Sequence, residues 1–285
     1  MIRILLCALS LLTVACQMKP TRTGSSEQRE FDLVVNKSTK PIELNDNMVV
    51  LDARPAFDYG LNRVIASHHF PWENLAESAE TGEVLRDKRK LAQRAALLGL
   101  TPTTPVVVIG NGPSGSGEEG RLAWTLLYMG FKDVQTASVE MFRKNLTQMA
   151  TPPPKNAPPA DLETEVAMVT SKAEFQRVAR DPKLRLENKI WILDVRSEKE
   201  YTNKPAGTPS KPDISALNVD WKQFYTANGR PDSNMRKKLK ALGINENDRL
   251  VIISNRGVRS ASAAYALISM GFTRVENFLP GWRSL

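Results

Sequence analysis

The segment Trp191-Ile192-Leu193-Asp194-Val195-Arg196 recurs in pattern earlier in the chain, as Val49-Val50-Leu51-Asp52-Ala53-Arg54. In both segments an apolar run ends in Asp-x-Arg. Two further matches follow in the same order and at nearly the same spacing. Residues 95–100 and 106–109 match residues 239–244 and 250–253, and residues 126–131 match residues 266–272. Three matches in one order predict a duplicated domain.

Each copy alternates short apolar runs with amphipathic helical stretches, which is typical of a parallel sheet in an α/β protein. The runs Val106–Ile109 and Leu250–Ile253 are apolar at every position, as expected of central strands. Each leads into a loop and then a helical stretch that ends at Gly130 or Gly271, since glycine accepts the left-handed conformation at a helix C-terminus. The expected fold class is α/β, with two domains that each contain a mainly parallel sheet flanked by helices.

Five prolines fall within residues 151–160, between the two copies. Proline continues neither a helix nor a central strand, so this segment is predicted to be a stiff, extended linker. The predicted domains are therefore residues 32–150 and 161–285. We expect them to fold separately.

The first fifteen residues have the composition of a signal peptide. Arg3 is followed by an apolar run, Ile4–Ala15, that is too short to span a bilayer comfortably. The run ends in Leu12-Thr13-Val14-Ala15-Cys16, which resembles the bacterial lipoprotein box. That resemblance implies that residues 1–15 are removed and that Cys16 becomes an acylated N-terminus, with residues 16–31 as a tether. The alternative is an ordinary secretory signal followed by a chance cysteine.

The resemblance also implies a location. Gln17, rather than an aspartate, follows the cysteine. In the best-known sorting rule this indicates the outer membrane. The expected location is the bacterial cell envelope, with the chain anchored by its lipid and facing the periplasm.

Composition excludes several kinds of chemistry. The chain has 285 residues, 41% of them hydrophobic, and only two cysteines and two histidines. Because both cysteines lie within the first 16 residues, the folded body is expected to lack disulfides, zinc–thiolate sites and thiol catalysis. We predict no metal site and no cofactor. The net charge of +8 is spread along the chain, so no nucleic-acid partner is predicted either.

The repeated segments, taken together, resemble the rhodanese family in its tandem, two-domain form, over residues 32–285. The resemblance rests on the two Asp-x-Arg segments, Pro71-Trp72, the strand–loop–helix unit Leu250–Ile268 and the closing Leu279-Pro280-Gly281-Trp282. The match is incomplete. Asp220 replaces the proline before Trp221, and Asn62-Arg63 stands where the family has a Gly-His pair.

In active rhodaneses the loop after the central strand reads Cys-x-x-Gly-x-Arg, and its cysteine carries a sulfur atom. Here Ser254 stands at that position in the second copy and Gly110 in the first. An alcohol forms no persulfide, and the second copy contains no histidine to act as a base. We therefore predict no catalytic residue.

The rest of the second loop keeps the features of an anion cradle at a helix N-terminus. The predicted anion-binding residues are Ser254, Asn255, Arg256, Gly257, Val258, Arg259 and Ser260. Measured against the helix that follows it, the loop of the first copy is three residues longer than the loop of the second copy. Arg121 therefore need not occupy the position of Arg259. Glu118 and Glu119 would oppose an anion there, so the first loop is predicted to have lost anion binding.

The Asp-x-Arg segments allow two interpretations. Asp52 with Arg54, and Asp194 with Arg196, are predicted to be structural ion pairs that fix the turn after a strand. The alternative is that they form catalytic pairs.

These observations favour a protein without enzymatic activity, which binds a partner protein or a small anion in the bacterial envelope. The expected partners are an unidentified envelope protein, an anion such as sulfate or phosphate, and the membrane through the lipid on Cys16. The alternative, which the family resemblance suggests, is an enzyme of the thiosulfate sulfurtransferase type. A phosphatase-like activity is a third possibility, but related phosphatases also need the missing cysteine.

Overall fold

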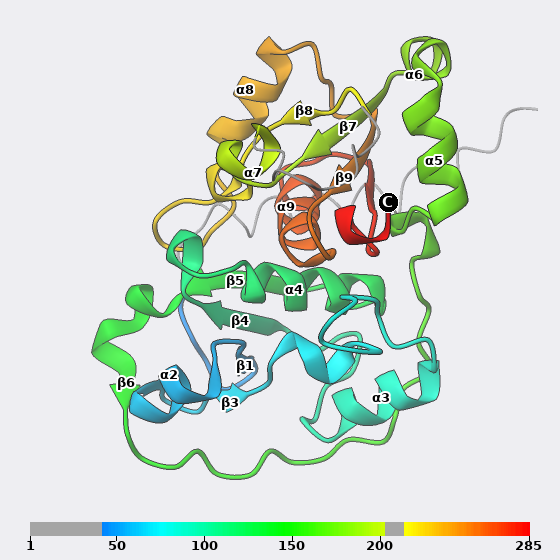
Figure 1. Cartoon of the computed structure of the whole chain (residues 1–285). Coiled ribbons are helices and arrows are strands. Elements are labelled where there is room, and N and C mark those ends of the chain that lie inside the picture. The colour runs from blue at the N-terminus through cyan, green and yellow to red at the C-terminus, as the bar shows by residue number, and fades with distance from the viewer. Residues whose placement is uncertain (1–41, 203–213) are drawn as a thin grey trace, which may run out of the picture.

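The computed structural model describes residues 42–202 and 214–285 (Figure 1). The predicted signal peptide, Cys16 and the tether lie outside these residues. Two four-stranded sheets form the framework, with strand orders β3-β1-β4-β5 and β8-β7-β9-β10. Every strand pair inside these sheets is parallel. The predicted α/β class, with parallel sheets flanked by helices, is confirmed.

The part of the chain before the proline-rich segment, residues 42–150, is called the first half. Its sheet strands are β1 (Val49–Asp52), β3 (His68–His69), β4 (Val106–Gly110) and β5 (Val134–Ser138). A separate antiparallel pair consists of β2 (Arg63–Val64) and β6 (Leu146–Thr147). The helices are α2 (Ala56–Leu61), α3 (Lys88–Ala96) and α4 (Glu118–Tyr128), with the 3₁₀ helices η1 (Trp72–Leu75), η2 (Gly112–Ser114) and η3 (Val139–Asn145).

Residues 161–285 are called the second half. Its strands are β7 (Ile190–Asp194), β8 (Leu217–Asn218), β9 (Arg249–Ile253) and β10 (Arg274–Asn277). Its α-helices are α5 (Lys172–Arg180), α6 (Pro182–Asn188), α7 (Glu198–Thr202), α8 (Asn234–Ala241) and α9 (Val258–Ser269). Its 3₁₀ helices are η4 (Val166–Met168), η5 (Trp221–Phe224) and η6 (Trp282–Ser284).

Residues Val106–Ile109 of β4 and Leu250–Ile253 of β9 are all apolar because each strand separates two cores. Alternate residues on one face belong to a large cluster of buried apolar side chains that includes residues of both halves: Val106, Val108, Leu250 and Ile252. The residues between them face smaller clusters, each confined to one half: Val107, Ile109, Val251 and Ile253. A side chain buried on either face of a strand favours an unbroken apolar run.

Helices α4 and α9 pack side by side between the two sheets (Figure 1). They approach closely at Gly120, where a Cβ atom would lie 2.1 Å from the Ser262 hydroxyl oxygen and 2.4 Å from that of Tyr225. The Tyr225 hydroxyl donates to the carbonyl of Ser262 (2.7 Å). The two halves therefore share one core through this crossing, and each half alone would expose it. Separate folding of the two halves stays a prediction, and the shared core argues against it.

The open edge of β5 is covered by a turn of the second half, residues 226–230. The Ser138 N–H donates to the carbonyl of Asn228 (2.7 Å), and the Thr136 hydroxyl donates to the carbonyl of Gly229 (2.9 Å). Unpaired strand edges invite association with other chains, so this contact protects the edge.

The proline-rich segment 151–160 contains neither helix nor strand. It follows the first half along its lower side in Figure 1, and the Ala157 N–H donates to the carbonyl of Ala96 (2.9 Å). The segment is thus attached to the end of α3, rather than crossing open space between the halves.

The crossing predicts the effect of adding one carbon atom at Gly120. A Gly120→Ala substitution should lower the free energy of unfolding by about 1–3 kcal/mol, because the helices must separate to admit the methyl group. Gly60→Ala is the control, since a Cβ atom there meets nothing within 4 Å. Urea denaturation of both variants measures the effect. Equal stability of the two variants would contradict the close approach.

Candidate functional site

The loop between β9 and α9 holds the serine that replaces the expected cysteine. The Ser254 side chain is buried, with 1% of the residue exposed. Its hydroxyl donates to the Ser260 hydroxyl (3.0 Å) and accepts from the Ser260 N–H (3.2 Å). In the described residues, these are the hydrogen bonds of that hydroxyl, and none of them comes from a base. Ser260 therefore orients this hydroxyl through both hydrogen bonds.

The backbone around this serine offers donors. Across the described chain, the N–H groups of residues 255–259 have no acceptor. Gly257 is the N-cap of α9 and has φ 75°, and a Cβ atom there would lie 2.4 Å from the carbonyl oxygen of Leu279. A glycine is needed at that position. Free N–H groups at the start of a twelve-residue helix can bind an anion.

The Arg259 side chain is engaged elsewhere. Its guanidinium donates two hydrogen bonds to the carboxylate of Glu200 on α7 (2.7 and 2.8 Å), and the Asn255 amide donates to the same carboxylate (2.9 Å). Arg259, with burial acting in the opposite direction, lowers the pKa of Glu200 to about 2. Anion binding by Arg259 itself stays a prediction, and in the structure this side chain is paired with Glu200. Its guanidinium fixes the loop to α7, and the backbone N–H groups are the available donors.

A turn of the first half, residues 77–83, approaches the same loop from the other side. The Arg256 guanidinium donates to the carbonyl of Ala79 (3.1 Å). A Cβ atom on Gly82 would lie 1.9 Å from the carbonyl oxygen of Arg256. The second loop is thus enclosed by α7 on one side and by the first half on the other.

The equivalent loop of the first half has different chemistry. Asp52 pairs with Ile109 and Asp194 with Ile253, so Gly110 corresponds to Ser254. Helix α4 begins after Gly117, seven positions beyond Gly110, whereas α9 begins after Gly257, three positions beyond Ser254. The first loop is therefore four residues longer, and the predicted difference of three is wrong because α4 is one residue shorter than α9.

This alignment places Glu119 at the position of Arg259, each the second residue after the glycine N-cap. Glu119 is 1% exposed, and a Cβ atom on Gly110 would lie 2.1 Å from its Oε2 atom. The carboxyl group thus fills the space next to Gly110. Burial, reinforced by the charge of Glu118, raises the pKa of Glu119 to about 8. A carboxyl group here leaves no room for an anion.

Arg121 is also buried, and it lies apart from the loop. Its guanidinium stacks over Trp72 and Trp124 at 5.3 Å from each ring, and it donates to the carbonyl of Gly82 (2.6 Å). Burial lowers its pKa to about 9. This arginine supports the turn that contacts the second loop.

The two Asp-x-Arg segments form ion pairs with matching geometry. In each, the aspartate accepts from the arginine side chain and from its backbone N–H (3.1 Å). Asp194 also accepts from the indole N–H of Trp282 (2.7 Å), and the guanidinium of Arg196 lies over that ring. Carboxylates with this many donors serve to hold the turn.

The two adjacent histidines have different surroundings. His69 contacts the carbonyl of Arg54 through Nε2 (2.9 Å) and stacks on Tyr59. His68 is half-buried, and burial lowers its pKa. Within the described residues there is no group of three or more residues able to hold a metal, and no helix there is long and apolar enough to cross a membrane.

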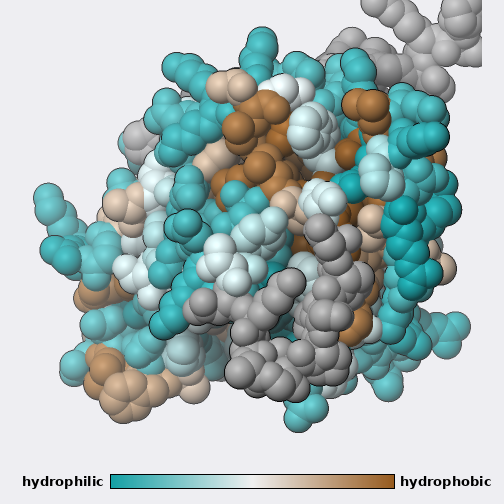
Figure 2. Space-filling view, turned by 45° about the horizontal axis from the view of Figure 1, so that its top comes forward, coloured by the Kyte–Doolittle hydropathy of each residue, from teal (hydrophilic) through white to brown (hydrophobic). Residues whose placement is uncertain are grey.

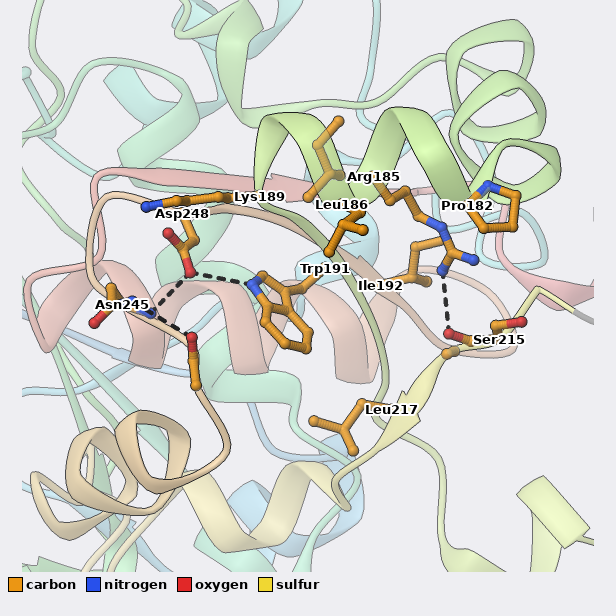
Figure 3. A pocket seen from close by; sticks show the side chains of 13 residues that line it. Pro182, Arg185, Leu186, Lys189, Trp191, Ile192, Ser215, Leu217, Asn245 and Asp248 are labelled. Carbon is orange, nitrogen blue, oxygen red and sulfur yellow. Dashed lines mark hydrogen bonds between the residues drawn. The ribbon is translucent and has the colours of Figure 1, made fainter.

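A cavity of about 580 Å³ lies apart from both loops, between α6, β7, β8 and the loop before β9 (Figure 3). Apolar atoms gather in the upper half of Figure 2, on the side of the second half. In the cavity, the Trp191 indole donates to Asp248 (3.1 Å), and Arg185 donates to the carbonyl of Ser215 (3.1 Å). Sequence reasoning missed this cavity, because its lining comes from separate segments between Pro182 and Asp248 and no local pattern marks it.

Comparisons with known proteins agree with this fold. A family model described as a rhodanese-like domain matches residues 173–284, so this part of the chain is a rhodanese-like domain. No curated protein sequence matches the chain.

Solved structures similar to the chain include EanB in complex with ergothioneine (16% identity, TM-score 0.69) and EanB carrying a cysteine persulfide (17%, 0.69). Another is the anaerobic ergothioneine biosynthesis enzyme of Chlorobium limicola in complex with trimethyl histidine (16%, 0.68). Each match covers 90% of this chain and 66% of the other, slightly less than two thirds of its length. At these identities the similarity shows the fold alone.

The buried carboxyl group of Glu119 predicts a pH dependence. Its pKa, about 8 when folded, exceeds the ordinary 4.5, so the folded state keeps a proton that the unfolded state releases. Stability should therefore fall as pH rises from 4.5 to 8. In Glu119→Gln this decline should shrink, with a gain on the order of 2 kcal/mol at pH 8. Urea denaturation across pH measures it, with the exposed Glu187→Gln as control. An equal decline in both variants would refute the assignment.

The ion pair of Glu200 predicts the opposite behaviour in acid. Its folded pKa is about 2, so its stabilisation is present above pH 4.5 and is lost as pH falls toward 2. Because about a third of the side chain is exposed, Glu200→Gln should cost only about 1 kcal/mol at pH 7. Glu198→Gln on the same helix is the matched control. The difference in stability between the two variants should narrow below pH 4.5, and a constant difference would exclude the pair as its source.

Proposed function

We propose that this chain is a lipid-anchored, tandem rhodanese-like protein of the bacterial envelope that binds an anion, or an acidic group of a partner protein, and transfers no sulfur. The observation that carries the proposal is the state of Ser254. It stands at the position of the family's cysteine, is buried, and has both hydrogen bonds to Ser260.

Sulfur transfer of the rhodanese type needs a thiolate, which attacks a sulfane sulfur atom and keeps it as a persulfide. No residue after Cys16 is a cysteine. The one site in the fold equivalent to Ser254 is Gly110, where the carboxyl group of Glu119 fills the space. Neither loop holds a group able to carry the sulfur atom.

Binding remains possible at the second loop. The free N–H groups of residues 255–259 can donate to a tetrahedral anion such as sulfate or phosphate, or to a carboxylate of a partner protein. Arg259 contributes indirectly, because its pair with Glu200 neutralises that carboxylate and holds the loop. At a site of this kind a dissociation constant near 1 mM, about 4 kcal/mol, is the expected scale.

The tandem arrangement is supported by the two sheets. They share the strand order, the Asp-x-Arg ion pair and a glycine N-cap on the helix after the central strand. The first half keeps the framework and has lost the chemistry of the loop. The lipid anchor is supported by the sequence Leu12–Cys16 and by the apolar run before it.

A sulfurtransferase is the second candidate. The observation that favours it is the likeness to structures of EanB, one of which carries a cysteine persulfide. The sulfur atom in that structure is carried by a cysteine, and residues 17–285 of this chain contain none, so the likeness supports the fold more strongly than the activity.

Sulfur transfer can be tested with a matched variant. After incubation with thiosulfate, the wild-type chain should gain no mass and release no thiocyanate from cyanide. The control is Ser254→Cys, which places a thiol where the family has its cysteine. If the loop can still accept sulfur, this variant should gain the mass of one sulfur atom. Turnover by wild-type protein above the rate without protein would overturn the proposal.

Anion binding can be followed by NMR. Titration with sulfate should shift the amide signals of residues 255–259 in a saturable way, with half-saturation near 1 mM. The first loop, residues 110–117, is the control inside the same molecule and should show no saturable shift. Shifts confined to the first loop would contradict the assignment, and the absence of shifts at both loops would exclude an anion site.

A further inference from the structure

The first half exposes four large apolar side chains on one side. Phe57 is 74% exposed, Leu61 54%, Ile65 55% and Met149 77%. We call these residues the α2–β6 patch. Single exposed apolar residues are common on protein surfaces, whereas a contiguous group of them marks a surface that binds something.

The four residues are contiguous because α2 and the β2–β6 pair meet there. Phe57 and Leu61 lie four residues apart on α2, so they share one face of that helix. The antiparallel register pairs Arg63 with Thr147. The pairing continues on one side, where the Ile65 N–H donates to the carbonyl of Asn145 (2.8 Å). On the other side α2 approaches the segment after β6, because the Tyr59 hydroxyl lies 3.5 Å from that of Thr151.

Helix α2, which ends at Leu61, leads directly into β2, and Met149 follows β6 by two residues, so both lie beside the paired strands. Figure 1 places α2 and β6 together at the lower left of the molecule. Figure 2 shows brown atoms along the same side.

The charges around the patch are mainly positive. Lys144 is exposed in the turn before β6, and the Arg63 guanidinium lies over the Tyr59 ring, 4.6 Å from its centre. The carboxylate of α2, Asp58, accepts a hydrogen bond from the Asn111 amide (3.3 Å). An apolar group bordered by cations is complementary to a lipid surface with anionic headgroups.

The described chain begins close to the β2–β6 pair. The described residues begin at Ile42, which is buried in one cluster with Val64 of β2 and Phe142 of η3, and Leu146 of β6 packs against that cluster. Twenty-five residues separate Cys16 from Ile42. A chain anchored at Cys16 would thus reach the fold beneath the β2–β6 pair.

We propose that the α2–β6 patch rests on the membrane that holds the anchor, with Phe57, Leu61, Ile65 and Met149 in the headgroup region. This proposal deepens the proposed function and rests on its lipid anchor. The anchor keeps the fold close to the bilayer, so a patch too weak to bind membranes by itself can dock as an intramolecular step. The first half then faces the membrane, and the second half with its loop faces away from it.

The scarcity of cysteine makes the test direct, since residues 17–285 contain none. Full-length, acylated protein is prepared with one added cysteine, Phe57→Cys or Met149→Cys, labelled with a fluorophore that reports polarity. Leu186→Cys and Leu242→Cys are the controls, because both leucines are exposed and lie on helices or helix ends of the second half. The protein is bound to vesicles of phosphatidylethanolamine, phosphatidylglycerol and cardiolipin.

Labels at positions 57 and 149 should shift to shorter wavelengths and should be quenched at least twofold more by brominated lipid than labels at positions 186 and 242. Equal quenching at all four positions, or none at 57 and 149, would overturn the proposal. A shift that needs no vesicles and grows with protein concentration would assign the patch to a second copy of the chain, and would also overturn it.

The anchor is tested separately by intact mass. Loss of residues 1–15 with added acyl mass supports the anchor whatever the fluorescence shows. If the mass shows no acyl chains, the anchor fails. The same variants, with Cys7 and Cys16 also changed to serine so that only the added cysteine is labelled, still decide the patch when they are mixed with the same vesicles. Quenching confined to positions 57 and 149 would then support membrane contact by the α2–β6 patch without a lipid anchor. The absence of such quenching would exclude both the patch contact and the anchor.

Discussion

The close crossing of α4 and α9 is the constraint on which the rest of the structure depends. Gly120 has no side chain, so Ser262 and Tyr225 of the second half can occupy the space beside it. This approach lets the inward faces of both sheets contribute to one core. It also sets the distance at which the turn 77–83 meets the second loop and the turn 226–230 meets the edge of β5.

The two loops show how one framework can carry opposite chemistry. Arg259 and Glu119 occupy equivalent positions, yet the arginine has a carboxylate partner on α7, whereas the glutamate is buried beside the like charge of Glu118. A buried carboxyl group avoids most of the cost of burial by keeping its proton. The second loop therefore keeps free backbone donors, while the first is closed by its own side chain.

Much of the fold could be predicted from the sequence because the repeated signals lie in short segments of neighbouring residues. Apolar runs identified β4 and β9, and Gly130 and Gly271 identified the ends of α4 and α9, since each signal involves neighbouring residues. The site was harder to predict. Glu200 lies 59 residues from Arg259, and nothing in the spacing links them. Two adjacent glutamates at a helix N-terminus indicate solvent exposure, whereas the lack of a Cβ atom at Gly110 gave Glu119 a buried place.

The crossing also restricts which helices can pair. Leu122 is the fifth residue after the N-cap glycine of α4, the place that Ser262 holds in α9, and Ser260 in α9 corresponds to Gly120. Two first halves would bring a leucine to the contact that Ser262 makes with Gly120, and two second halves would bring a Cβ atom against the Ser262 hydroxyl. The two halves therefore fit each other at this crossing better than two copies of either half would. Chains that exchanged halves would keep this fit only with α4 against α9.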